Sequence, residues 1–174
     1  EWYTKRLGKY YGSHGIKANL SIGQGEVLVT PVQLCAYFSA LANDGVWKKP
    51  HLLKKAIGDK TLLYEELENN EGVRLPVSID HIKLLQDGLW QAVNGAGSTG
   101  GAARVPGVNV YGKTGSAENA HGTSTHAWFA CYAKWEEPEL AVVVFLENAG
   151  HGGSMAAPIA GKIISYYNKH MRDK

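Results

Sequence analysis

The sequence predicts an α+β fold in which an antiparallel sheet is flanked by helices. Two segments with apolar residues at three- and four-residue spacing precede a run of strand candidates, and another helical segment ends the chain. A short Glu-Glu-Pro connection joins the last two strand candidates, which suits an antiparallel pair. With 174 residues, of which 44% are hydrophobic and 20% charged, the chain is long enough for one domain with its own core.

The first helix is predicted to begin at Pro31. Thr30 is a suitable N-cap, and its spacing to Gln33 forms a Thr-x-x-Gln capping box. Leucine and aromatic residues then recur at helical spacing, until Asn-Asp-Gly at residues 43–45 predicts the end of the helix. The preceding residues 1–29 are rich in glycine and weakly periodic, so we expect them to be mostly loop.

Short strands are expected near residues 49–57 and 61–64, before a second helix that begins after Ser78 or Asp80. The apolar stripe of this helix consists of Ile82, Leu85, Leu89 and Val93. These residues are spaced as one face of a helix requires. A glycine-rich loop is predicted to follow over residues 94–101.

Strands are predicted over residues 108–114, 126–135 and 140–147. The last of these, LAVVVFLE, is almost entirely apolar, as expected for a central strand that is covered on both faces. The final helix is predicted to begin near Ser154. Its apolar stripe consists of Ile159, Ile163, Ile164 and Tyr167.

Composition excludes several classes of function. A formal net charge of +2 without a clustered basic face argues against nucleic acid as a partner. No apolar run approaches the roughly 20 residues that cross a bilayer, so we expect no membrane segment in this chain. His121, His126 and His151 lack the spacing of a zinc site, and we expect neither a metal nor a cofactor. Cys35 and Cys131 lie in apolar stretches and are interpreted as buried thiols.

The stretch GVNVYGKT at residues 107–114 fits two motifs that demand different chemistry. It matches the G-x-x-x-x-G-K-[ST] pattern of a phosphate-binding loop, which must be slack and must lead directly into a helix. Residues 108–111 instead alternate as a strand, and Gly115 is a poor helix residue. The K-T-G of Lys113 to Gly115 is also a motif of penicillin-recognising enzymes. We therefore favour a lysine on a strand, and nucleotide hydrolysis stays as an alternative.

A lysine at the end of an edge strand offers a positive charge and three hydrogen-bond donors. Thr114 adds a hydroxyl at the next position, and together these groups suit a ligand that carries a carboxylate. Gly115 has no side chain, which leaves room for a peptide backbone to pair with the strand. The residue types thus predict a site for an extended peptide with a terminal carboxylate.

Longer stretches of the chain carry a resemblance to a known family. They are LSIGQGEVLVTPVQL at residues 20–34, YGKTGSAE at 111–118, HAWFACYA at 126–133 and GHGGSMAAP at 150–158. In sequence and in order, these stretches resemble class B penicillin-binding proteins, most closely the elongation-type penicillin-binding protein 2. The resemblance covers nearly the whole chain and is weakest across residues 46–76.

The resemblance implies a D,D-transpeptidase of the penicillin-recognising fold, in which a serine attacks the D-Ala-D-Ala bond of a cell-wall stem peptide. It implies that Lys113 and Thr114 bind the terminal carboxylate of substrate or β-lactam, and that Lys113 also helps proton transfer. It makes the backbone N–H of Ser116 one donor of the oxyanion hole. Glu118 and His126 are candidates for the wall of the cleft, although a surface position is the simpler interpretation.

The catalytic serine of such an enzyme is missing from this sequence. No serine is followed by lysine in an S-x-x-K motif or by asparagine in an S-x-N motif. The resemblance implies that both motifs lie upstream, so residues 1–174 are expected to be the C-terminal portion of a single transpeptidase domain, inactive alone. The missing portion is expected to supply some of the helices that cover the sheet.

The resemblance also implies a cellular setting. The expected partners are peptidoglycan stem peptides, β-lactam antibiotics and other cell-wall elongation proteins. The expected place is the extracytoplasmic face of the bacterial cytoplasmic membrane, with the complete protein anchored there. A non-catalytic peptide- or wall-binding module of the same fold, and a serine β-lactamase or carboxypeptidase, stay open as alternatives.

Overall fold

The structure is a computed structural model that describes residues 14–25, 27–53, 55–58, 61–65, 72–118 and 124–172. The chain divides into two compact units, Glu1–Thr30 and Pro31–Lys174. The expectation that residues 1–174 form part of one transpeptidase domain stays a prediction.

The first unit contains helix α2 (His14–Ser21), so the prediction of mostly loop for residues 1–29 was wrong there. None of its side chains is buried, and it therefore lacks the apolar period by which a packed helix is recognised. Its end is closed by local hydrogen bonds instead: the Ser21 hydroxyl donates to the carbonyl of Ala18 at 2.7 Å, and the Gln24 N–H donates to the carbonyl of Asn19 at 2.9 Å.

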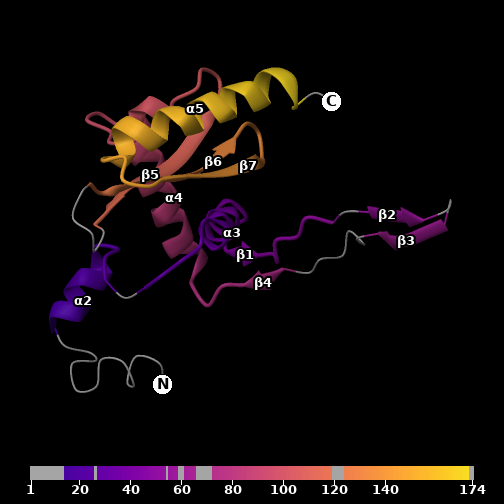
Figure 1. Cartoon of the computed structure of the whole chain (residues 1–174), viewed down its shortest axis with the longest axis horizontal. Coiled ribbons are helices and arrows are strands. Elements are labelled where there is room, and N and C mark those ends of the chain that lie inside the picture. Colours follow the sequence, from indigo (N-terminus) through magenta and orange to yellow (C-terminus); the bar gives the residue numbers. More distant parts are fainter. Residues whose placement is uncertain are drawn as a thin grey trace. The chain divides into compact units, whose positions relative to one another are not determined.

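The second unit is built on an antiparallel sheet with the strand order β5-β6-β7. These strands are β5 (Asn109–Ala117), β6 (His126–Lys134) and β7 (Pro138–Leu146). Helix α5 (Gly152–His170) lies on one face of the sheet, while α3 (Pro31–Ala42) and α4 (Ile79–Asn94) lie on the other (Figure 1). The predicted α+β class, with helices flanking an antiparallel sheet, is confirmed.

The remaining elements of this unit are short. They are β1 (Val46–Trp47), β2 (Lys55–Gly58), β3 (Thr61–Glu65), β4 (Val73–Arg74) and the 3₁₀ helix η2 (Gly101–Ala103). Two antiparallel pairs form among them, β1 with β4 and β2 with β3. The predicted strands near residues 49–57 and 61–64 correspond to β2 and β3, although β2 is shorter than expected.

Local sequence signals determine both helices on the second face. α3 begins at Pro31 as predicted and ends where Asp44 and Gly45 adopt positive φ angles of 50° and 83°. There the Gly45 N–H donates to the carbonyl of Ala40 at 2.8 Å, which satisfies a carbonyl of the last turn. Helix α4 begins after Ser78, whose hydroxyl accepts a hydrogen bond from the N–H of His81 at 3.3 Å.

The strand register separates two apolar clusters. On the α5 side, Phe129 and Cys131 of β6 are completely buried, whereas Ala130 and Tyr132 face α3 and α4. On that second face, Phe38, Leu41 and Ile82 complete the cluster. Alternate residues of β6 therefore contribute to opposite layers, which explains why the strand is apolar or aromatic between its ends, His126 and Lys134.

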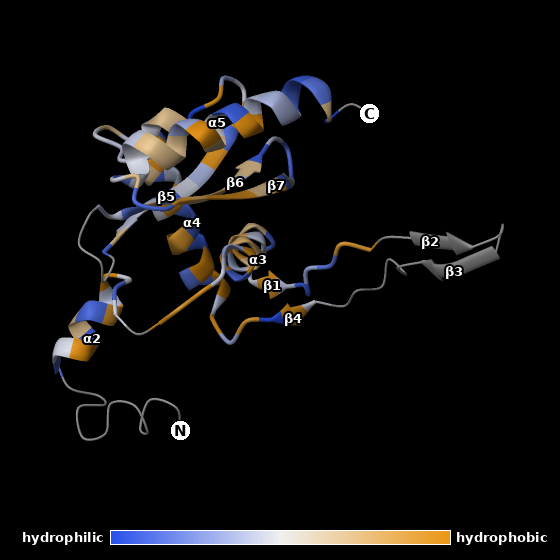
Figure 2. Ribbon diagram, in the orientation of Figure 1, coloured by the Kyte–Doolittle hydropathy of each residue, from blue (hydrophilic) through white to orange (hydrophobic). Residues whose placement is uncertain are grey.

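Strand β6 is central in this sheet, and the prediction that LAVVVFLE would be the central strand was wrong. LAVVVFLE contributes β7, which is an edge strand among the described residues. Its apolar character has another cause: Val142 and Val144 pack on the α5 side, while Ala141 and Val143 pack against the cluster under α3. Burial of both faces, and not a central position, produces the hydrophobic band along β7 in Figure 2.

Helix α5 packs on the sheet through small residues, which differs from the predicted stripe. Its buried residues are Gly152, Ala156, Ala157, Ala160, Gly161 and Ile164. Of the predicted residues only Ile164 is fully buried, while Ile159 and Ile163 are 37% and 43% exposed. Small side chains also allow α5 to approach η2 closely: a Cβ on Gly161 would lie 3.1 Å from the carbonyl oxygen of Ala102 in η2.

Both cysteines are free thiols; Cys131 is buried as predicted, whereas Cys35 is only half-buried. Burial raises the pKa of Cys131 to about 12 from an ordinary value of 9.0, and it also raises the pKa of Cys35. We expect a thiol-specific chromogenic reagent to label Cys131 only after unfolding, as measured in a Cys35→Ser variant. Rapid labelling of this variant under native conditions would contradict the burial of β6.

The raised pKa of Cys131 affects the stability of the protein at high pH. Because the folded-state pKa of Cys131 lies above that of the unfolded chain, the folded protein holds this proton more tightly. The corresponding stabilisation is present below pH 9 and is lost as the pH rises towards 12.

Candidate active site

The Lys113-Thr114-Gly115 motif lies in the middle of strand β5. The strand continues as far as Ala117, so no helix begins after the lysine. A phosphate-binding loop requires such a helix, and the structure therefore excludes that interpretation of residues 107–114. Lys113 is exposed, while Thr114 and Gly115 are half-buried.

Strand β5 is an edge strand, since its pairing partner among the described residues is β6. Along its other edge, the carbonyl of Val110 accepts a hydrogen bond from the Asn94 side chain at 2.9 Å. Residues two apart on a strand direct their backbone groups to the same side, so those of Gly112, Thr114 and Ser116 point towards the same edge. The Lys113 ammonium also reaches this edge, where it donates to the carbonyl of Thr114 at 2.8 Å.

The side chains of Lys113 and Thr114 project from opposite faces of the sheet. Lys113 pairs with Ala130 and shares the face of α3 and α4. The Thr114 hydroxyl belongs to the α5 side, where it hydrogen-bonds the hydroxyl of Thr99 at 3.3 Å. A ligand that lies along the edge of β5 can therefore meet an ammonium group from one face and a hydroxyl from the other.

Gly115 lies at a crowded point, where neighbouring groups approach it from two sides. A Cβ here would lie 3.2 Å from the Cβ of Trp128, the residue with which Gly115 pairs. On the other side, the start of α5 lies against its backbone, because a Cβ on Gly152 would be 2.5 Å from the Gly115 oxygen. The missing side chain thus keeps a face of the sheet clear beside Trp128. This is a second effect of Gly115, besides the room that it leaves for a peptide backbone at the edge of the strand.

Ser116 lies next to the N-terminus of α5. Its hydroxyl accepts a hydrogen bond from the Gly152 N–H at 3.3 Å and lies 3.4 Å from Nδ1 of His151. The strand that carries the K-T-G motif is therefore tied to the helix that covers it. The sequence favours a surface or hydrogen-bonded histidine at position 151, and His151 is both exposed and within reach of Ser116.

Glu118 and His126 lie where β5 ends and β6 begins. Glu118 is exposed directly after β5, and His126 pairs with Ala117. Nδ1 of His126 accepts a hydrogen bond from the Asn148 N–H at 3.1 Å, which leaves Nε2 as the protonated nitrogen of the neutral ring. The ring also packs edge-on against Phe145, with centroids 5.5 Å apart. His121 lies outside the described residues.

A large apolar groove adjoins Lys113 on the face of α3 and α4. Its volume is about 600 Å³. Its lining residues are Leu34, Tyr37, Phe38, Leu41, Leu84, Leu85, Gly88, Leu89, Ala92, Lys113, Thr114, Gly115, Trp128 and Ala130. Leu84 and Leu85 are 69% and 45% exposed, so this groove presents apolar side chains at the surface. The K-T-G strand forms the polar border of this groove.

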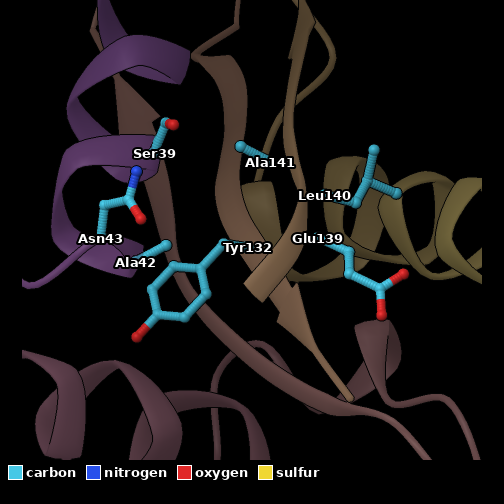
Figure 3. A pocket seen from close by; sticks show the side chains of 7 residues that line it. All are labelled: Ser39, Ala42, Asn43, Tyr132, Glu139, Leu140 and Ala141. Atoms are coloured by element: carbon cyan, nitrogen blue, oxygen red, sulfur yellow. The ribbon is translucent and has the colours of Figure 1, made fainter. Parts of the chain in front are cut away.

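A second hollow lies further along the same face of the sheet and has less room for a ligand. It measures about 90 Å³, and Figure 3 shows α3 residues such as Asn43 facing Tyr132 and Ala141 across it. Burial, with smaller contributions from Tyr111 and nearby carboxylates, raises the pKa of Tyr132, so this phenol stays neutral. The groove beside Lys113 is therefore the better candidate for the functional site.

The described residues form neither a metal cluster nor a membrane-spanning helix. Among them, no group of three or more His, Cys, Asp or Glu side chains is arranged to hold a metal ion. Within the same part of the chain, no helix is both long and apolar enough to span a bilayer.

The structure brings several residues to this site that the sequence did not single out. Thr99 contacts Thr114, Gly152 lies against the backbone of Gly115, and the leucines of α4 line the groove. Their contacts join positions far apart in the chain, and no local pattern reports such pairs. The density of glycine over residues 95–101 was the available signal for Thr99, and it indicated only a loop.

An antiparallel sheet between helices, with K-T-G on its edge strand beside a groove, defines the class of penicillin-recognising proteins. The chain belongs to the family described as the penicillin binding protein transpeptidase domain, whose family pattern matches residues 5–165. Within this family it is of the class B, penicillin-binding protein 2-like type.

Three relatives support this assignment. Peptidoglycan D,D-transpeptidase MrdA of Haemophilus influenzae is 34% identical over 182 residues, which cover 96% of this chain and 28% of that protein. The crystal structure of Pseudomonas aeruginosa PBP2 in complex with WCK 5153 has a TM-score of 0.77 at 28% identity, over 95% of this chain and 35% of the other. Penicillin-binding protein A of M. tuberculosis, as an imipenem acyl-enzyme complex, has a TM-score of 0.75 at 26% identity, over 91% and 35%. The chain thus spans about a third of the length of these relatives.

Proposed function

We propose that this chain carries the K-T-G side of the active site of a peptidoglycan D,D-transpeptidase. In this reaction a serine forms an acyl-enzyme with one stem peptide, and an amine of a second stem peptide resolves it. β-Lactams acylate the same serine. The proposal rests chiefly on one observation: Lys113 and Thr114 stand on the accessible edge of β5, where a ligand meets the ammonium group and the hydroxyl together.

Each site residue has a role in this proposal. Lys113 and Thr114 bind the terminal carboxylate through charge-assisted hydrogen bonds, and Lys113 also helps proton transfer near the serine. The Ser116 N–H, which points to the same edge as the carbonyl of Val110, donates to the oxyanion of the tetrahedral intermediate. Glu118 and His126 border the cleft at the end of the strand.

The serine comes from a segment outside the 174 residues, since the sequence has no S-x-x-K motif. We place that segment in the apolar groove between α3, α4 and β5. Two features favour this location: the groove borders Lys113, and its exposed leucines need an apolar cover. A helix laid there would bring a serine at its end close to the lysine. We use the term complete protein for the polypeptide that contains both this chain and that segment.

Labelling with a fluorescent penicillin tests this proposal. The isolated chain is expected to remain unlabelled, because it lacks the nucleophile. When the chain is refolded together with a separate polypeptide that carries the missing motifs, label is expected on that polypeptide alone. Covalent label on the isolated chain would contradict the proposal, and so would an unlabelled complete protein.

The proposal also includes the substrate, the partners and the cellular location of the complete protein. The substrate is a stem peptide that ends in D-Ala-D-Ala, and β-lactams and other cell-wall elongation proteins are the further partners. The site acts on the extracytoplasmic side of the bacterial cytoplasmic membrane, where a segment outside this chain anchors the complete protein. No cofactor takes part in this chemistry.

A further inference from the structure

The loop between α4 and η2 holds one threonine in a fixed place beside the K-T-G motif. The Gly95 N–H donates to the carbonyl of Gln91, and the Gly100 N–H donates to the carbonyl of Ala92, each at 2.9 Å. From the other side, Arg104 donates to the Ser98 hydroxyl at 2.7 Å. Both ends and the middle of the loop are therefore hydrogen-bonded, so that the position of Thr99 between Ser98 and Gly100 is well defined.

Thr99 meets two other elements. Its hydroxyl lies 3.3 Å from the Thr114 hydroxyl, and its carbonyl lies so close to α5 that a Cβ on Gly153 would be 2.5 Å from the oxygen. The loop, the start of α5 and strand β5 thus converge at this point. Such packing keeps the two hydroxyl groups facing each other.

We propose that Thr99 is a positioning residue for the carboxylate site. A hydroxyl has one proton to donate and can accept two hydrogen bonds. Thr114 can donate to a carboxylate only when its proton is not given to Thr99. When a carboxylate arrives, the pair reverses: Thr99 donates to Thr114, and Thr114 donates to the ligand. The two hydroxyl groups then form a chain in which each hydrogen bond polarises the next.

This inference rests on the proposed function, because it requires that Thr114 receives a carboxylate. It adds a residue that does not touch the ligand and acts through Thr114. It also distinguishes the hydroxyl of Thr99 from its methyl group, since only the hydroxyl can donate. Valine at position 99 keeps the shape of the side chain and removes the donor.

Acylation rates of the complete protein test the proposal. The rate constant is measured with benzylpenicillin, which carries a carboxylate, and with its methyl ester, which does not. Thr99→Val is expected to lower the rate about 3- to 10-fold with the acid, as the loss of one hydrogen bond implies, and to leave the rate with the ester unchanged. Thr99→Ser, which keeps the hydroxyl, is expected to restore the rate to within about twofold.

A hydroxyl outside the loop provides the matched control. Ser154→Ala removes an exposed hydroxyl that donates to the carbonyl of His151 and does not bond Thr99 or Thr114, and the preference for the acid is expected to persist. An equal loss with acid and ester in Thr99→Val, or no loss with either, would overturn the inference. A wild-type protein that does not prefer the acid, or a Thr114→Val variant that keeps the preference, would instead refute the proposed role of Thr114, and the inference with it.

Discussion

Replacing Lys113 with alanine in the complete protein is expected to lower the rate of acylation by benzylpenicillin about 100- to 1,000-fold. The ammonium group lies at the edge of β5, where the ligand is proposed to dock. A hydrogen bond to a charged group contributes about 1.5–3 kcal/mol, and help with proton transfer contributes about 10²- to 10⁴-fold. The measurement is the second-order rate constant of acylation by benzylpenicillin, determined in competition with a fluorescent or chromogenic β-lactam.

Lys134→Ala is the matched control for this variant. Lys134 also belongs to the sheet, on the neighbouring strand β6, but it pairs with Pro138 at the opposite end of that strand from His126. Its loss removes the same charge from the protein and is expected to change the rate by less than about twofold, because a charge at a distance is screened by water and salt. Equal rates for Lys113→Ala and the wild type would contradict the proposed role of Lys113 in the site.

Placing alanine at Gly152 is expected to destabilise the complete protein by about 2–4 kcal/mol. The added Cβ would meet the carbonyl oxygens of Trp128 and Gly115, which belong to the paired backbones of β5 and β6. Backbone atoms of two paired strands cannot move aside as a flexible side chain does, so α5 must shift away from the sheet. Thermal unfolding measured by circular dichroism is expected to show a clearly lower Tm.

Gly152→Ala is also expected to affect the candidate active site. Since the Gly152 N–H donates to the Ser116 hydroxyl, a shift of α5 also disturbs the strand that carries the K-T-G motif. Ser154→Ala changes an exposed residue in the same helical turn and is expected to cost less than about 1 kcal/mol. If Gly152→Ala unfolded at the wild-type temperature, the close contact of α5 with β5 would be wrong.

Local signals explain which parts of the fold could be predicted from the sequence. The starts of α3 and α4 depend on residues within one helical turn. The predicted start at Pro31 is confirmed, and of the two predicted starts for α4, Ser78 and Asp80, the structure has the one after Ser78. The alternation of Val108 to Tyr111 predicts a strand that carries Lys113, and the structure confirms this strand. The strand that carries a short contiguous motif is therefore accessible from the amino-acid sequence alone, while the chemistry of the motif stays a proposal.

Long-range packing explains the parts that could not be predicted. An apolar strand such as LAVVVFLE reports burial of both faces, and it does not report whether the strand lies at the centre or the edge. Likewise, glycine and alanine in α5 carry no strong apolar period, although they make the close contact with the sheet. Thr99 and Thr114 are 15 residues apart, and Ser116 and His151 are 35 apart, so that only the fold brings these pairs together.

A crystal structure of the complete protein acylated by benzylpenicillin tests the central claim most directly. We expect the ligand to lie along β5, with its carboxylate within about 2.7–3.2 Å of both Lys113 Nζ and the Thr114 hydroxyl. The acylated serine is expected to belong to a segment in the groove beside α3 and α4. A carboxylate bound by other groups, with the edge of β5 unoccupied, would contradict the account.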